Sequence, residues 1–274
     1  MSSPILQQIQ ETVSYLKTRY AAIPEVGIVL GSGLGNFTRE ITIEAEVPYG
    51  EIPHFPVSTV EGHSGRLIFG ELAGKKVVAM AGRFHYYEGY SPQEVVFPVR
   101  VMKYLGVKTV LLSNAAGAVN PGFNVGDIMI IRDHVSFFTP NPLIGKNIAE
   151  LGPRFPDMSE PYKKQLIHTA KAIGAENGFD LKEGVYVAVT GPTFETRAEY
   201  KLIHVAGGDV VGMSTVQETI AAVHMGLDVF AASVVTDIGI REEENVITHE
   251  EVLAAAKEAE PKLALLFKEL VRTI

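Results

Sequence analysis

Residues 82–90, GRFHYYEGY, bring together side chains that could bind an anion beside a flat or sugar-like partner. Arg83 carries a fixed positive charge, His85 has an imidazole that titrates near neutral pH, and phenol rings stand close by. A guanidinium can donate two parallel hydrogen bonds to an oxyanion. The structural alternative is that the aromatic rings pack in a core while Arg83 pairs with the nearby Glu88.

Further polar side chains follow apolar runs that have the composition of buried strands. Ligands of open α/β sheets bind in the crevice where strands end, so these residues are expected to converge. The strand ends contribute Ser32, Arg83, His85, Asn114, Glu195, Ser214, Thr236 and Asp237. We expect one pocket, with an anion-binding half at Ser32, Arg83, His85 and Ser214 and an acidic half at Glu195 and Asp237.

Several of these residues also have simpler explanations. Ser32, Ser214 and Thr236 are of types that cap helices. His63, in EGHSGR, would suit an ordinary loop. Five other histidines are taken as structural or exposed: His54, His134, His168, His204 and His224.

Two familiar motifs are incomplete. GSGLG at 31–35 lacks the third glycine of the dinucleotide-binding fingerprint, because position 36 is Asn36. The remaining turn can still hold an anion with its backbone N–H groups and the Ser32 hydroxyl. Neither Ser32 nor Ser214 stands in a G-x-S-x-G elbow, which disfavours a Ser-His-Asp hydrolase. No His/Asp/Glu spacing is typical of a metal site, so we expect neither a metal nor a cofactor.

The apolar pattern places these residues on alternating strands and helices. Helical spacing occurs at 5–19, and capping boxes open helices at SPQE (91–94, reaching about Leu105), TRAE (196–199) and THEE (248–251). Strands are expected at 26–30, 66–72, 76–81, 108–113, 127–133 and 184–189, and in DVVGM and DVFAASVV on either side of the helix VQETIAAVHMG. Residues 137–161 are rich in proline and should form a long loop before a helix at 162–177.

This alternation, with several strands apolar on both faces, is typical of an α/β protein with a mixed or mostly parallel central sheet. The 274 residues suffice for one large core. The sequence shows no repeat, low-complexity tract or linker, so we expect one domain over residues 1–274.

The composition narrows the range of partners. A formal net charge of -8 without a Lys/Arg cluster disfavours nucleic acid or an anionic membrane as a partner. The chain has no cysteine, which excludes disulfides, thiolate catalysis and cysteine-bound metals. The N-terminal segment lacks the pattern of a signal peptide, and no apolar run approaches the roughly 20 residues of a membrane span. We therefore expect a cytoplasmic protein.

Taken together, the motifs resemble those of purine nucleoside phosphorylases of the trimeric class. The matching blocks cover essentially the whole chain in order: GSGLG (31–35), IPHFPVSTVEGHSGRL (52–67), GRFHYYEGY (82–90), NAAGAVNP (114–121), GDIMIIRDH (126–134), GPTFET (191–196), VGMST (211–215) and HEEVL (249–253). The resemblance implies a single α/β domain around a mixed, partly barrel-like sheet. It also implies reversible phosphorolysis of a purine nucleoside to free purine and ribose 1-phosphate.

The resemblance further implies roles for individual residues. The catalytic residues would be His85, Glu195 and Asp237. Phosphate would be bound by Ser32, His63, Arg83, His85, the backbone N–H of Ala115, and Ser214. The nucleoside would contact Tyr87, Phe194, Glu195, Val211, Met213, Thr236, Asp237 and His249. Phe155 would reach the active site of a neighbouring subunit in a homotrimer.

One residue departs from the family pattern. Position 237 is aspartate, where phosphorylases of this class typically have asparagine and the related 5′-methylthioadenosine phosphorylases have aspartate. Glu195 and His249 favour the former group, because the methylthioadenosine enzymes have a small hydroxyl residue at the first position and His249 suits a 5′-hydroxyl. We expect 6-oxopurine nucleosides to be preferred. A methylthioadenosine phosphorylase and a non-catalytic nucleoside- or phosphate-binding protein remain the alternatives.

Overall fold

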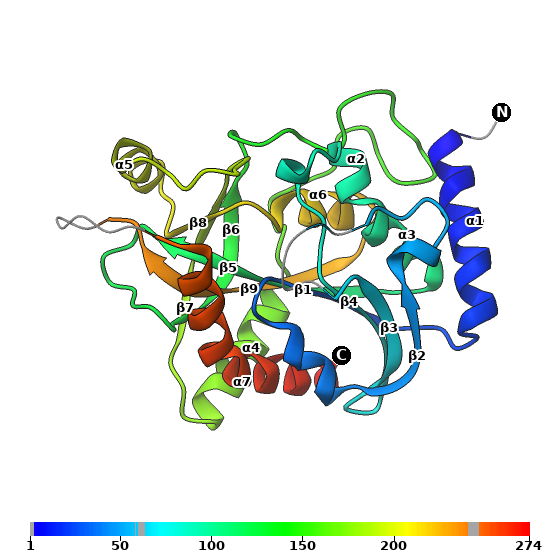
Figure 1. Cartoon of the computed structure of the whole chain (residues 1–274), viewed down its shortest axis with the longest axis horizontal. Coiled ribbons are helices and arrows are strands. Elements are labelled where there is room, and N and C mark those ends of the chain that lie inside the picture. The colour runs from blue at the N-terminus through cyan, green and yellow to red at the C-terminus, as the bar shows by residue number, and fades with distance from the viewer. Residues whose placement is uncertain (1–2, 58, 60–63, 241–246) are drawn as a thin grey trace.

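Figure 1 shows the computed structural model of the chain, which describes residues 3–57, 59, 64–240 and 247–274. Its strands are β1 (Val26–Leu30), β2 (Thr42–Pro48), β3 (Arg66–Leu72), β4 (Lys75–Ala81), β5 (Thr109–Ala118), β6 (Ile128–Val135), β7 (Leu181–Ala188), β8 (Val210–Gly212) and β9 (Asp228–Ile238). Its α-helices are α1 (Pro4–Arg19), α2 (Pro92–Val95), α3 (Phe97–Leu105), α4 (Lys164–Glu176), α5 (Arg197–Val205), α6 (Val216–His224) and α7 (His249–Thr273). Short 3-10 helices are η1 (Gly35–Glu40), η2 (Tyr49–Glu51) and η3 (Tyr86–Glu88).

The strands form one mixed sheet with the order β2-β3-β4-β1-β5-β8-β7-β6-β9. Because β5 also pairs with β9, the strands β5, β8, β7, β6 and β9 close into a five-stranded barrel, from which β1, β4, β3 and β2 extend as an open sheet. Strand β1 is parallel to both β4 and β5, whereas β5 and β8 are antiparallel. The predicted α/β fold with a mixed, partly barrel-like sheet is therefore confirmed.

Helices cover both sides of this sheet (Figure 1). In this view α2, α3 and α6 lie above it and α4 and α7 below it, while α1 packs beside α3. All of β1 is buried, and Ile9 and Leu16 of α1 are fully buried, as their helical spacing predicts. At the start of α2, Ser91 Oγ accepts a hydrogen bond from Glu94 N at 3.3 Å, and the predicted capping boxes of α5 and α7 form in the same way.

Several predicted elements differ from the structure. The single helix expected from Pro92 to Leu105 is divided into α2 and α3 at Val96. Pro98 explains the break, because it has no N–H to donate and its ring clashes with the carbonyl four residues earlier. Helix α4 begins at Lys164 rather than at 162. Strand β2 is missing from the sequence prediction because a largely exposed edge strand shows little apolar alternation.

Strand β5 is also longer than expected, and this shapes the site. The sequence predicts a strand that ends at Ser113, since asparagine, alanine and glycine are poor strand formers. The parallel pairing with β9 nevertheless continues to Ala118. On its other edge, β5 pairs with β1 only as far as Leu112 and with β8 only from Gly117. Between them, within the described residues, 113–116 have no strand partner on that edge, so the sheet splits there.

Candidate active site

A cavity of about 370 Å³ opens where the sheet splits. It is bordered by the segments after β1, β4, β7 and β8, by the open edge of β5, by β9 and by the start of α7. The cavity-lining residues include the following predicted site residues: Ser32, Arg83, His85, Tyr87, Ala115, Phe194, Glu195, Val211, Met213, Ser214, Thr236, Asp237 and His249. Asn114, from the strand-end set, lines it too.

Two predicted site residues are not placed there. Phe155 does not line the cavity: its side chain is 86% exposed, and the guanidinium of Arg154 lies 5.6 Å from the centre of its ring. His63 lies outside the described residues.

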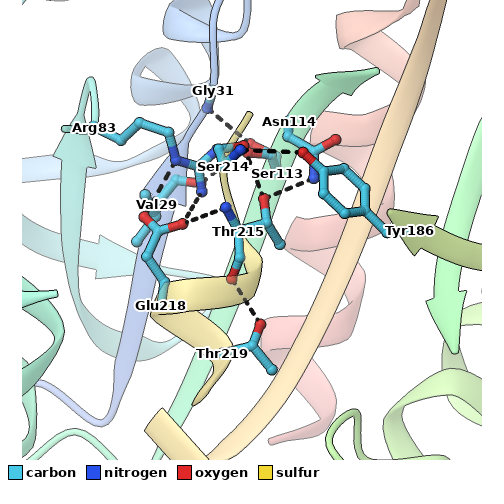
Figure 2. A network of polar contacts seen from close by, with 10 residues as sticks. All are labelled: Val29, Gly31, Arg83, Ser113, Asn114, Tyr186, Ser214, Thr215, Glu218 and Thr219. Carbon is cyan, nitrogen blue, oxygen red and sulfur yellow. Dashed lines mark hydrogen bonds and ion pairs between the residues drawn. The ribbon is translucent and has the colours of Figure 1, made fainter. Parts of the chain in front are cut away.

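Arg83 is held by a carboxylate that is far away in the sequence (Figure 2). Its Nε donates to Glu218 Oε1 at 3.2 Å and its Nη2 to Glu218 Oε2 at 2.9 Å, and the two side chains are only 1% and 4% exposed. Its Nη1 donates to the backbone carbonyl of Ser113. The ion pair with Glu88 that sequence proximity suggested is therefore not the one that forms.

Ser113 also closes the gap between β1 and β5. Its hydroxyl accepts a hydrogen bond from Gly31 N and donates to Val29 O, both at 3.2 Å. Gly31 is needed here for space, because a Cβ on it would lie 2.8 Å from Asn114 Cα and 3.3 Å from Arg83 Nη1. The glycine therefore lets the β1 end approach the guanidinium closely.

Glu88 pairs with His85 instead. His85 Nδ1 and Glu88 Oε1 are 2.9 Å apart. Burial tends to raise the pKa of Glu88, but hydrogen bonds from His85 and Thr59 outweigh it and bring this pKa to about 2. An ionised carboxylate only accepts, so Nδ1 must carry the proton. Burial lowers the pKa of His85, which keeps the ring neutral near pH 7 with its proton on Nδ1.

Ser214 stands directly before α6, whose N-cap is Thr215. Its backbone N–H donates to Tyr186 Oη at 3.2 Å, and Asn114 Nδ2 donates to Thr215 Oγ1 at 2.9 Å (Figure 2). Ser214 itself is thus not the helix cap. The positive end of the α6 dipole lies beside it, which favours an anion at this side of the cavity.

The acidic half comes from a loop and a strand. Glu195 precedes α5, whereas Asp237 lies inside β9, where Thr236 Oγ1 donates to its Oδ1 at 3.0 Å. Gly117 makes room for this carboxylate, since a Cβ there would lie 2.6 Å from Asp237 Oδ2. Burial raises the pKa of Glu195, and the nearby charge of Asp237 raises it further.

Tyr87 connects the aromatic stretch to the cavity. Its ring stacks on that of His85, with centroids 4.6 Å apart and planes 16° from parallel. Burial raises the pKa of Tyr87 to about 12, so the phenol keeps its proton and can donate a hydrogen bond. Its face and hydroxyl therefore suit a sugar beside the anion.

The residues that sequence reasoning missed are those that hold the site together: Glu88 as the partner of His85, Ser113, Thr215 and Glu218. TVQE at 215–218 has capping-box spacing, which marks a helix start. That spacing gives no sign that Glu218 also binds Arg83. Within the described residues, no group of three or more His, Cys, Asp and Glu side chains could hold a metal ion. In the same part of the chain, no helix is long and apolar enough to cross a membrane.

Comparison with known proteins identifies the family of the chain. A sequence profile of the phosphorylase superfamily matches residues 25–272. Purine nucleoside phosphorylase 1 of Geobacillus stearothermophilus is 48% identical over 97% of both chains. Purine nucleoside phosphorylase of Rattus norvegicus is 46% identical over 98% of this chain and 95% of its own.

Solved structures of the Schistosoma mansoni purine nucleoside phosphorylases have the same fold, each with a TM-score of 0.93 and coverage of 98% of this chain. Isoform 2 with cytosine and ribose-1-phosphate is 42% identical, with 96% of its chain covered. The adenosine complex is 41% identical with 98% covered, and the inosine complex 40% with 97%. With 48% identity to one relative along almost its whole length, the chain belongs to the phosphorylase superfamily and, within it, to the purine nucleoside phosphorylases.

Proposed function

We propose that the cavity binds inorganic phosphate and a purine nucleoside side by side and cleaves 6-oxopurine nucleosides in preference to adenosine. The main observation behind this proposal is that Arg83 and Ser214 line the same cavity as the carboxylates Glu195 and Asp237. The Schistosoma mansoni enzymes were solved with inosine, with adenosine, and with cytosine and ribose-1-phosphate, so these relatives bind the kinds of nucleoside and sugar phosphate that the proposal requires. The reaction needs phosphate as a co-substrate and no cofactor.

In this arrangement, phosphate would contact Arg83, His85 and Ser214 and lie next to the anomeric carbon of the ribose. Holding both reactants in one cavity removes much of the entropic cost of a two-substrate reaction. As the glycosidic bond lengthens, positive charge develops on the ribose and negative charge on the purine. The phosphate stabilises the first. Glu195, as an acceptor, orients the base through its N1–H. A phosphate oxygen then bonds to the anomeric carbon, and the purine leaves.

His85 has a defined part in binding phosphate. Because Nδ1 donates to Glu88, the neutral ring has an unprotonated Nε2. That nitrogen can accept a hydrogen bond from a protonated phosphate oxygen rather than donate one.

Glu195 provides the argument for the base preference. A 6-oxopurine has a proton on N1, which an ionised Glu195 can accept, whereas the bare N1 of adenine would face another acceptor. A mispaired buried polar group costs about 1–3 kcal/mol, so Glu195 alone favours inosine and guanosine by roughly ten- to a hundredfold. Asp237 reduces this preference for 6-oxopurine nucleosides. An ionised carboxylate can accept a hydrogen bond from the 6-amino group of adenine but has no proton to donate to O6.

Replacing Asp237 by asparagine should therefore widen the preference for 6-oxopurines. The two side chains are isosteric, and Thr236 Oγ1 can still donate to the amide oxygen. The amide can donate to O6 or N7, so we expect the inosine-to-adenosine ratio of kcat/KM to rise by about tenfold. The measurement is that ratio in both proteins. An unchanged ratio would refute the role given to Asp237.

A substrate panel tests the proposed function as a whole. Inosine, guanosine, adenosine and 5′-methylthioadenosine are each incubated with enzyme and phosphate, and the free base is quantified. We expect inosine and guanosine to be cleaved fastest, adenosine slowly, and methylthioadenosine least. Methylthioadenosine as the best substrate would instead support a methylthioadenosine phosphorylase, and no cleavage of any nucleoside would support a binding protein.

We further propose that the enzyme is a homotrimer in which Phe155 completes the sugar pocket of a neighbouring subunit. The support is the family resemblance and the exposure of this ring, in a segment between β6 and α4 that has no helix or strand. A cytoplasmic location remains our expectation, since a chain without cysteine suits a reducing compartment.

Replacing Phe155 by alanine should raise the nucleoside KM by about tenfold, because truncated aromatic anchors at interfaces commonly cost more than about 1 kcal/mol. The melting temperature should hardly change, since the ring is exposed within the protomer. Phe137, which is 91% exposed in the same segment, gives a matched control as Phe137→Ala. Full activity of wild-type enzyme in a dilute, demonstrably monomeric sample would contradict the proposal.

A further inference from the structure

Glu218 connects two parts of the anion-binding half (Figure 2). Its Oε1 accepts from Arg83 Nε, and its Oε2 accepts from both Arg83 Nη2 and the backbone N–H of Thr215, the latter at 2.9 Å. One carboxylate therefore holds the guanidinium that follows β4 and the turn that carries Ser214. These two segments lie 135 residues apart in the chain, measured from Arg83 to Glu218.

The geometry also decides how Arg83 can meet an anion. The edge of the guanidinium formed by Nε and Nη2 is used by Glu218, and Nη1 contacts Ser113 O. A phosphate would therefore contact the terminal nitrogens of the guanidinium, Nη1 and Nη2. The position of that end depends on how Glu218 fixes the plane of the group, because a bidentate pair sets orientation as well as distance.

The turn beside Ser214 also depends on this carboxylate. Thr215 has a φ of +69°, a conformation that is costly for a β-branched residue and persists only when its surroundings hold it. The contact from its N–H to Glu218 is one of those restraints. Asn114 Nδ2 and the Ser214 hydroxyl restrain its side chain, at 2.9 and 3.1 Å from Thr215 Oγ1.

We propose that Glu218 is a positioning residue for phosphate, which orients Arg83 and the Ser214 turn without touching the substrate. This inference rests on the proposed function, because it assumes that Arg83 and Ser214 receive phosphate. Glu218 acts through Arg83, so its removal should weaken the use of phosphate and leave the contacts to the nucleoside in place.

Within the part of the chain that the structure describes, matched glutamates cap helices without binding a cation. Glu94, Glu199 and Glu251 also accept from the N-cap backbone N–H, at 2.8, 2.7 and 3.3 Å. These contacts are exposed, whereas that of Glu218 is buried. Glutamine also serves in capping boxes, so a Glu→Gln change preserves the cap and removes the charge. Glu218→Gln and Glu94→Gln therefore separate the contact with Arg83 from the capping function.

We expect Glu218→Gln to lower kcat/KM for phosphate by roughly ten- to a hundredfold, because an amide oxygen that keeps the cap on Thr215 N–H leaves the amide N–H₂ facing Arg83 Nε. The nucleoside KM should change by less than about threefold, since those contacts remain. Glu94→Gln should match the wild type in both constants. The increase in melting temperature on adding phosphate should also be smaller in Glu218→Gln than in the wild type.

A double-mutant cycle tests whether Glu218 acts through Arg83. Adding Glu218→Gln to Arg83→Met should have almost no further effect on kcat/KM for phosphate, whereas independent effects would multiply and overturn the inference. Should Glu218→Gln not fold, Glu218→Asp serves, because the shorter side chain withdraws the carboxylate from Arg83. An unchanged phosphate kcat/KM in the variant that folds would also overturn it. Wild-type cleavage that does not depend on phosphate would instead overturn the proposed function.

Discussion

Replacement of Arg83 by methionine is expected to lower kcat/KM for phosphate by about 10²–10³-fold, the usual cost of removing a hydrogen-bond donor that stabilises an anionic reactant. It should also lower the free energy of unfolding by about 3–5 kcal/mol, because Glu218 would remain as a buried carboxylate without its cation. Steady-state kinetics with varied phosphate and urea denaturation measure the two effects.

Two controls separate these effects. Arg272→Met removes an exposed ion pair with Glu269 at 3.3 Å and should leave both activity and stability nearly unchanged. The double variant Arg83→Met/Glu218→Gln removes both charges, so it should recover stability but not activity. Wild-type phosphate kinetics in the single Arg83→Met variant would show that Arg83 does not bind phosphate.

Replacement of Glu195 by alanine is expected to lower kcat/KM for inosine by roughly ten- to a hundredfold, since a hydrogen bond to a charged group contributes about 1.5–3 kcal/mol. Adenosine should lose much less, because its N1 has no proton for Glu195 to accept. The inosine-to-adenosine ratio should therefore fall towards one. Glu199→Gln, which removes an exposed charge but keeps the cap at the start of α5, should leave that ratio unchanged.

The pH dependence of kcat/KM for inosine follows from the ionisation of Glu195. Glu195 accepts the N1 proton only when ionised, so kcat/KM for inosine should be full above its pKa and fall as the pH drops through it. Because burial raises this pKa, the decline should begin at a higher pH than for an ordinary glutamate, whose pKa is about 4.3. Glu195→Ala should lack this decline. A wild-type acid limb that persists unchanged in the variant would assign it to another group.

The sequence predicted the fold well where local patterns determine structure. Capping boxes at Ser91, Thr196 and Thr248 each begin a helix, and the buried strand predicted at 26–30 is β1, which lies between β4 and β5. The failure at β5 has a different kind of cause, because it depends on a contact that is distant in the sequence. The part of β5 beyond Ser113 is a strand because it pairs with β9, which lies more than 100 residues later in the chain. Local strand propensity cannot predict such a distant pairing.

The sequence also predicted only part of the candidate site. Residue types at strand ends predicted which side chains meet in one cavity, because parallel strands bring their ends together. The partners of these side chains were harder to predict. Sequence proximity suggested Glu88 as the partner of Arg83, yet Glu88 binds His85 and Glu218 binds Arg83. Opposite charges close in sequence pair only if the fold points them at each other. In η3, the backbone turns Glu88 towards His85.

The central claim is that phosphate is the attacking reactant, and the stoichiometry of the reaction tests it most directly. Enzyme is incubated with inosine in phosphate buffer and in a phosphate-free buffer of equal ionic strength, and hypoxanthine, inorganic phosphate and the sugar product are quantified. We predict loss of one phosphate for each hypoxanthine released, ribose 1-phosphate as the sugar product, and no release without phosphate. Equal release in the phosphate-free buffer, with free ribose as the product, would contradict the claim.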